Sequence, residues 1–146
     1  MYYQRVKISV AIPCHHPGKS TYGDYCYLNN GALLCEFLKI NDLNSGILDI
    51  DYHAGDGSHD IKLNFYLSIH ADPWMKYPFT IPEYFDNSLS FGPKCSWEEY
   101  KKLLITALNK MLNLDVWIIA IGLDTLKSDP EVRESMRSTI EIDDYL

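Results

Sequence analysis

One short segment of the chain, residues 47–57, concentrates side chains that could do chemistry. Its sequence, ILDIDYHAGDG, is an apolar run that ends in two carboxylates and an imidazole. Because strand side chains point to alternate faces, Asp49, Asp51 and His53 are predicted to share one face as the strand ends. Carboxylate oxygens and imidazole nitrogens are ligands of divalent metals such as zinc. The segment therefore predicts half of a metal site.

A pair of adjacent histidines, His15 and His16, is the second candidate. The pair lies in the sequence PCHHPG, on a loop that two prolines restrain. Two imidazoles that titrate near neutral pH can supply a general base and a general acid. Two alternatives stay open here: solvated loop histidines, and a Cys-His nucleophile made with Cys14, for which the sequence offers no orienting third group.

Asp124 completes a set of three metal ligands with Asp51 and His53. Three protein ligands leave positions open for water and substrate, as catalytic zinc requires. Taken alone, Asp124 is better explained as the N-cap of a turn after the last strand. A magnesium-dependent phosphohydrolase with Asp-x-Asp at a strand end is a weaker alternative, because such enzymes need a hydroxyl residue where His53 stands. A calcium loop is excluded, because Ala54 and Asp60 stand where that loop needs Gly and Glu.

The elements that must position these side chains alternate between strands and helices. Apolar runs predict the strands, and apolar spacing of three or four residues predicts the helices. In chain order they are a strand at 6–12, a helix at 28–40, strands at 47–52 and 65–70, a helix at 97–112 and a strand at 116–121. Ser96 and Glu99 form a capping box that opens the second helix. Residues 71–95 show no convincing period, which predicts a long functional loop.

This alternation predicts a single α/β domain with a mainly parallel sheet and flanking helices. The last strand is apolar throughout and is predicted to be buried on both faces, as parallel sheets require. Sites in such folds form at the carboxyl ends of the strands. The histidine pair, the 47–57 segment, His70 and Asp124 all fall at such ends. Their coincidence supports one composite site.

Composition limits the function classes. The formal net charge of -7 argues against nucleic-acid binding, which needs clustered Lys and Arg. The longest apolar stretch is too short to span a bilayer, and the N-terminus lacks the apolar core of a signal peptide. The four cysteines form no C-x-x-C pair, so reduced thiols are predicted. We expect a cytoplasmic protein, or a nuclear one in a eukaryote.

Taken together, the motifs resemble those of the zinc-dependent histone deacetylase and acetylpolyamine amidohydrolase family. The matching blocks follow the family's order and cover nearly all of residues 10–130; they are PCHH at 13–16, YCYLNN at 25–30, LDIDYHAGDG at 48–57, SIHADP at 68–73, YPF at 77–79 and GLDT at 122–125. The YPF and LDT details lean toward the acetylpolyamine amidohydrolase-like and class II branch. The resemblance implies an arginase-like fold, shortened at both ends.

The same resemblance implies which side chains hold ions. Asp51, His53 and Asp124 would bind zinc, with iron(II) as the alternative metal. The Ser68 side chain, with backbone carbonyls of the metal-binding segment, would resemble the family's structural potassium site.

The resemblance also implies the catalytic pair. His15 and His16 would move protons, with Asp49 and Asp56 as their respective carboxylate partners. Such partners set the tautomer of an imidazole and raise its basicity.

The implied activity is hydrolysis of an acetyl-lysine or an acetylpolyamine to acetate and a free amine, in a channel lined by Tyr25 and Tyr77. The chain departs from the family at Ala54, where a second histidine is usual, and at Cys14, where a glycine is usual. It also ends before the Gly-Gly-Tyr region that supplies the family's carbonyl-polarising tyrosine. The alternative is therefore a metal-binding remnant or binding module, completed by another chain or a second copy.

Overall fold

A single parallel sheet forms the centre of the protein, as predicted. The computed structural model describes residues 7–11, 14–20, 22–23, 26–79, 88–130, 139–141 and 143. The strands are β1 (Lys7–Ala11), β2 (Ser45–Asp49), β3 (Tyr66–Ala71), β4 (Ser88–Phe91) and β5 (Val116–Ala120). Their order is β1-β5-β2-β3-β4, and every neighbouring pair is parallel. The carboxyl ends of all five strands therefore lie at one edge of the sheet.

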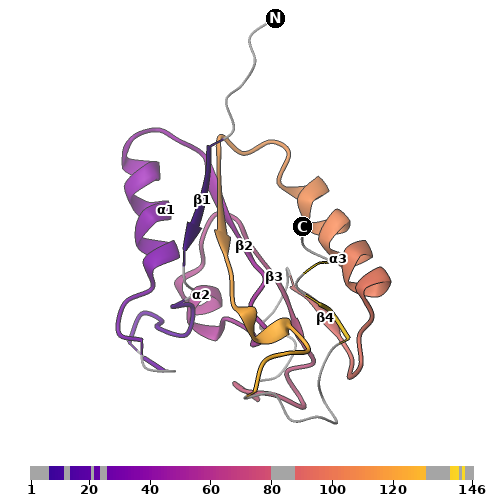
Figure 1. Cartoon of the computed structure of the whole chain (residues 1–146). Coiled ribbons are helices and arrows are strands. Elements are labelled where there is room, and N and C mark those ends of the chain that lie inside the picture. Colours follow the sequence, from indigo (N-terminus) through magenta and orange to yellow (C-terminus); the bar gives the residue numbers. More distant parts are fainter. Residues whose placement is uncertain are drawn as a thin grey trace, which may run out of the picture.

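Helices cover both faces of the sheet. They are α1 (Asn30–Ile40), α2 (Asp56–Ile61) and α3 (Trp97–Lys110). Figure 1 shows α1 and α3 on opposite sides of the strands. Successive strand residues serve the two faces: Ile47 packs in a cluster with Cys35 of α1, and Leu48 packs in a cluster with Tyr100 of α3. No described helix is both long and apolar enough to cross a membrane.

Side-chain caps define where the two long helices begin. The Asn29 side chain accepts a hydrogen bond from the Ala32 N–H at 2.9 Å, which satisfies a donor that the first turn leaves free. The predicted capping box of α3 is confirmed: Ser96 accepts from the Glu99 N–H, and the Glu99 carboxylate accepts from the Ser96 N–H at 2.9 Å.

Two elements were missed by the sequence patterns. Helix α2 contains Gly57, a poor helix former, and it has only six residues, ending before Lys62, which has a left-handed φ of 58°. Strand β4 lies within residues 71–95, which were predicted to be a loop. It has only four residues at the edge of the sheet, too few to show a period.

The strand predicted at 116–121 is less buried than expected. In β5, Val116, Ile118 and Ala120 are buried, whereas Trp117 and Ile119 are only partly buried. The α1 side of β5 is thus fully covered, and the α3 side is covered in part. An apolar run alone does not distinguish these two degrees of burial.

Candidate metal centre and histidine pair

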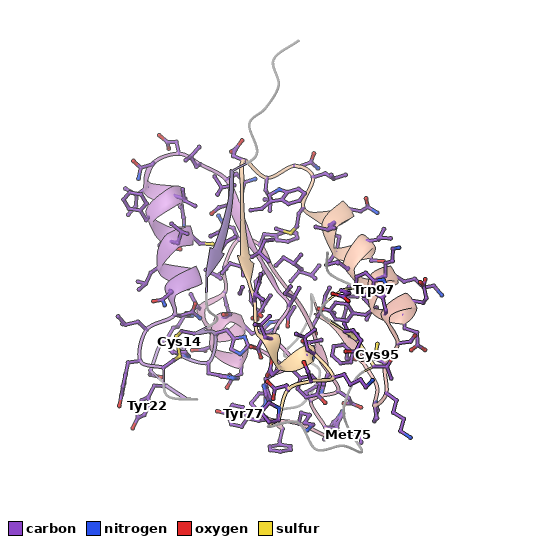
Figure 2. All side chains as sticks on the ribbon, viewed as in Figure 1. Cys14, Tyr22, Met75, Tyr77, Cys95 and Trp97 are labelled. Carbon is purple, nitrogen blue, oxygen red and sulfur yellow. A yellow bond between two sulfur atoms is a disulfide. The ribbon has the colours of Figure 1, made fainter. Side chains whose placement is uncertain are left out.

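The carboxyl edge of the sheet gathers most of the predicted site residues. The histidine pair follows β1, Asp49 ends β2, and Asp124 lies in the short 3-10 helix Leu123–Thr125 after β5. Figure 2 shows Cys14 and Tyr77, which flank this region, toward the same lower end of the sheet. The sheet topology therefore explains why residues so far apart in the sequence meet.

Asp51, His53 and Asp124 form one cluster whose ligand atoms all lie within 4.8 Å of one another. The His53 Nδ1 atom is 2.8 Å from Asp124 Oδ2 and 3.4 Å from Asp51 Oδ1. Asp51 is buried, whereas His53 and Asp124 are half-buried. A cluster that is closed on one side and reachable on the other fits a metal with an open coordination position.

Backbone N–H groups hold the side chains of Asp49 and Asp51 where β2 ends. The strand stops at Asp49, earlier than the predicted end at residue 52, although the Ile50 N–H still donates to the Ala120 carbonyl and the Ala71 N–H to the Tyr52 carbonyl, both at 2.9 Å. The Asp51 N–H donates to Asp49 Oδ1 at 3.1 Å, and the His53 N–H donates to Asp51 Oδ1 at 2.8 Å. Asp124 Oδ1 accepts from the Tyr52 N–H at 3.2 Å, which ties this segment to the residues after β5.

Gly122 allows the two acids of the cluster to approach. A Cβ atom at this position would collide with the Asp51 carboxylate and lie 2.7 Å from Asp124 Oδ1. The requirement is steric, because the Gly122 φ of -102° suits any residue. A side chain here would displace Asp51, Asp124 or both.

The charges of the cluster favour a bound cation. Burial by itself lowers the pKa of His53, but hydrogen bonds and attraction from Asp124 and Asp51 outweigh it and raise the pKa to about 9. Burial raises the pKa of Asp51. Without a metal, these carboxylates therefore hold a proton on His53. A divalent cation supplies the same compensation, so the donor set fits zinc.

The two histidines are buried and each contacts one carboxylate. His15 Nδ1 lies 2.6 Å from Asp49 Oδ2, and His16 Nδ1 lies 2.7 Å from Asp56 Oδ1. The two Nε2 atoms are 3.1 Å apart, which is hydrogen-bond distance when one of them carries a proton. Both rings thus turn their Nδ1 atoms toward a carboxylate and their Nε2 atoms toward each other.

This pair adjoins the metal cluster. His15 Nε2 is 3.6 Å from Asp51 Oδ1. Burial by itself lowers the pKa of His15, but the charge and hydrogen bond of Asp49 outweigh it and raise the pKa to about 9. The histidine pair and the cluster of Asp51, His53 and Asp124 are therefore in contact at this end of the sheet.

Ser68 and Tyr77 lie near this centre, each in a different setting. Ser68 pairs with Asp49 in the β2–β3 register and is fully buried, and its Oγ makes no hydrogen bond within the described part of the chain. A buried hydroxyl of this kind suits a ligand such as a cation. The Tyr77 ring packs edge-on against His16 with centroids 4.8 Å apart, and its side chain is exposed. Tyr25 lies outside the described residues.

One expectation about the cysteines is wrong. Cys14 and Cys26 form a disulfide, with their Cα atoms 5.5 Å apart, while Cys35 and Cys95 are free and buried. The bond excludes Cys14 as a thiolate nucleophile in this state. The chain folds back between the two residues through a Gly23–Cys26 bridge, a contact that the 12-residue spacing alone does not reveal.

Sequence reasoning also missed Tyr66, whose hydroxyl donates to Asp49 Oδ2 at 2.7 Å. Its place two residues before Ser68 on β3 was the available signal, because the two side chains share a face.

The amino-acid sequence is similar to those of known amidohydrolases. Acetylpolyamine amidohydrolase 1 of Pseudomonas aeruginosa is 32% identical to this chain, over 81% of this chain and 39% of that protein. Acetylpolyamine amidohydrolase of Mycoplana ramosa is 27% identical, over 81% of this chain and 40% of that protein. The chain therefore spans about two-fifths of the length of these relatives.

Solved structures share the fold. A crystal structure of acetylpolyamine aminohydrolase from Burkholderia pseudomallei superposes with a TM-score of 0.80 at 24% identity, covering 94% of this chain and 45% of that one. The structure of a histone deacetylase homologue from Aquifex aeolicus has a TM-score of 0.70, also at 24% identity, covering 87% of this chain and 38% of that one. The family model of the histone deacetylase domain matches residues 3–141. The chain therefore belongs to the histone deacetylase domain family.

Proposed function

We propose that this protein is a zinc-dependent amide hydrolase that removes the acetyl group from an acetylated amine. The observation that carries the proposal is that two groups of side chains lie together at the carboxyl ends of the strands. A three-ligand cluster lies beside a carboxylate-supported histidine pair, with His15 Nε2 only 3.6 Å from Asp51 Oδ1. Iron(II) is the alternative metal for the same nitrogen and oxygen donors.

Asp51, His53 and Asp124 would hold the metal through one carboxylate oxygen, His53 Nδ1 and a second carboxylate oxygen. When bound, the metal would polarise the acetyl carbonyl and lower the pKa of a water molecule. Asp124 is suited to this role because its Oδ1 is anchored by the Tyr52 N–H while its Oδ2 faces His53. The cluster is therefore organised before any ion binds.

His15 and His16 would move the protons of the reaction. The Nε2 atoms face each other at 3.1 Å, so a proton taken from water by one ring can be held within the pair. Asp49 and Asp56 stabilise the imidazolium that forms, because each accepts from an Nδ1–H. The pair would then return a proton to the departing amine, which needs one to leave.

An acetylpolyamine is the favoured substrate, with acetyl-lysine as the second choice. The relatives described above are acetylpolyamine amidohydrolases, and the net charge of -7 suits a cationic amine. Exposed aromatic rings at Trp74, Tyr77 and Phe79 follow β3 on the segment that brings Tyr77 against His16. Aromatic faces attract ammonium groups, so these rings can form a channel wall. The motif resemblance assigns Tyr25 to the same channel, and this residue lies outside the described residues.

A structural potassium ion is proposed beside the centre. The buried Ser68 Oγ and backbone carbonyls around Asp49 would hold it, since hard cations bind oxygen ligands.

A second candidate is a metal-binding module without turnover. Ala54 stands where a second histidine is usual in the family. In this case another chain or a second copy would complete the active centre.

Acetate release from an acetylated diamine and from an acetyl-lysine peptide separates the two candidates. The zinc-loaded protein should release acetate, and Asp124→Asn should abolish release. Asp42→Asn is the matched control, because Asp42 is exposed and its left-handed φ of 57° suits Asn. Stoichiometric zinc without acetate release would support the module and exclude hydrolysis by this chain.

A further inference from the structure

We propose that Tyr66 is a positioning residue that holds the Asp49 carboxylate, and through it His15, in the geometry for proton transfer. The proposal rests on the proposed function for its kinetic part, while its structural part can be tested without turnover. Tyr66 lies on β3, and its hydroxyl donates a hydrogen bond to Asp49 Oδ2.

The Asp49 carboxylate is held by three donors. His15 Nδ1 and the Tyr66 hydroxyl both donate to Oδ2, at 2.6 and 2.7 Å, and the Asp51 N–H donates to Oδ1 at 3.1 Å. Asp49 is 0% exposed and Tyr66 is 5% exposed, so water does not replace these donors. In a buried setting each such bond is strong and its loss is costly.

The fold places the Tyr66 hydroxyl beneath Asp49 by strand register. Ile47 pairs with Tyr66 and Asp49 pairs with Ser68, so the Tyr66 side chain lies one strand over and two residues back. The His59 ring packs edge-on against the Tyr66 ring at 4.7 Å between centroids. The Tyr66 ring thus has β2 beside it and makes a contact with His59 of α2.

Gly55 supplies the space in which these groups meet. A Cβ atom at Gly55 would collide with the Tyr66 hydroxyl and lie 3.0 Å from both Asp49 Oδ2 and the His15 Cβ. The close approach of the Tyr66 hydroxyl, the Asp49 carboxylate and His15 therefore requires a glycine at position 55.

The hydroxyl acts by orientation. Burial, followed by the Asp49 charge, raises the pKa of Tyr66 well above its usual range, so the group remains a donor. With two donors on Oδ2 and one on Oδ1, the carboxylate cannot rotate without breaking a buried hydrogen bond. His15 thereby keeps its Nδ1 toward Asp49 and its Nε2 toward His16.

Steady-state kinetics of Tyr66→Phe measure this contribution. We expect kcat to fall about 10- to 100-fold, as for other outer partners of catalytic groups, with KM within about twofold and zinc content unchanged. Tyr100→Phe is the matched control, because Tyr100 is equally buried but packs in the α3 cluster on the other face. An unchanged kcat in Tyr66→Phe, with the variant folded, would overturn the kinetic part.

Proton NMR of the zinc-loaded wild-type protein tests the geometry independently of turnover and of any variant. The His15 Nδ1–H and the Tyr66 hydroxyl proton should both be protected from exchange and show a nuclear Overhauser effect to each other, since both point at Asp49 Oδ2. In Tyr66→Phe the His15 resonance should shift and exchange faster, and in Tyr100→Phe it should not.

The outcomes separate this proposal from the proposed function. A wild-type protein that shows the Overhauser effect but releases no acetate would contradict the hydrolase and leave Tyr66 as the holder of Asp49. Absence of the effect, with both protons assigned, would overturn the positioning role even if acetate is released.

Discussion

His53 Nδ1 lies 2.8 Å from Asp124 Oδ2, and this contact joins the loop after β2 to the loop after β5. The two strands are direct neighbours in the sheet, with Asp49 paired to Ala120 at their ends. Parallel pairing therefore places the two loops side by side before any metal binds. Asp51 follows β2, as His53 does, and it is the buried member of the cluster.

Gly122→Ala should remove bound zinc. The added methyl group would meet the Asp51 carboxylate and Asp124 Oδ1, so the two acids could not converge. Gly92→Ala is the control, because a Cβ there meets nothing within 4 Å. Elemental analysis after dialysis should find zinc in Gly92→Ala and little in Gly122→Ala; full occupancy in both would show that the approach at Gly122 does not matter.

His16→Asn should keep zinc but lose turnover. His16 contacts Asp56 and His15 through its ring nitrogens, whereas the three proposed ligands form a separate cluster. Removal of one general acid-base group typically costs about 10²- to 10⁴-fold in rate. Zinc content and kcat should be measured on one preparation, and a variant with wild-type kcat would exclude His16 from proton transfer.

The metal-free protein should lose stability as the pH rises from about 6.5 to about 9. The pKa of His15 is about 9 in the folded protein and near 6.5 in the unfolded chain, so the folded state binds the extra proton. Its contribution is present below pH 6.5 and lost as the pH passes through about 9; a shift of this size corresponds to about 3 kcal/mol.

Urea denaturation of chelator-treated protein at about pH 6 and about pH 10 measures the difference. His53 should add a loss of the same sign, because its pKa is also raised to about 9. In His15→Asn the difference between the two pH values should shrink, and an equal difference in variant and wild type would refute the assignment to His15.

Thiol counting should reveal the disulfide. Protein purified without reductant and then denatured should show two reactive thiols, those of Cys35 and Cys95, and four after reduction. In the native state Cys95 should react slowly, because burial raises its pKa to about 11 and little thiolate forms. Four thiols without reductant would contradict the Cys14–Cys26 bond.

Sequence patterns predicted much of the fold, and the positions of the strand ends then predicted which site residues lie together. Alternating strands and helices, the Ser96 capping box and the grouping of the strand-end acids and histidines were all accessible from periodicity. The edge strand β4 was too short for a period, and α2 contains a residue that disfavours helices. Their existence depends on contacts with the rest of the fold, such as the bond from the Ser58 N–H to the His15 carbonyl at 2.9 Å.

Side-chain contacts between different strands could not be predicted from the sequence patterns. Tyr66 reads as one more aromatic residue of a buried strand, and only the β2–β3 register brings its hydroxyl to Asp49. The Cys14–Cys26 bond similarly depends on a fold-back of the chain. The hydrogen bonds from the Asp51 and His53 N–H groups to the carboxylates two residues earlier were not predicted either.

X-ray absorption at the zinc edge tests the central claim most directly. For the zinc-loaded protein we predict only nitrogen and oxygen ligands at about 2.0–2.2 Å, with the scattering of one imidazole that disappears in His53→Ala. Sulfur ligands at about 2.3 Å would place zinc on the cysteines instead. That result, or an unchanged imidazole signal in His53→Ala, would contradict a metal centre at Asp51, His53 and Asp124.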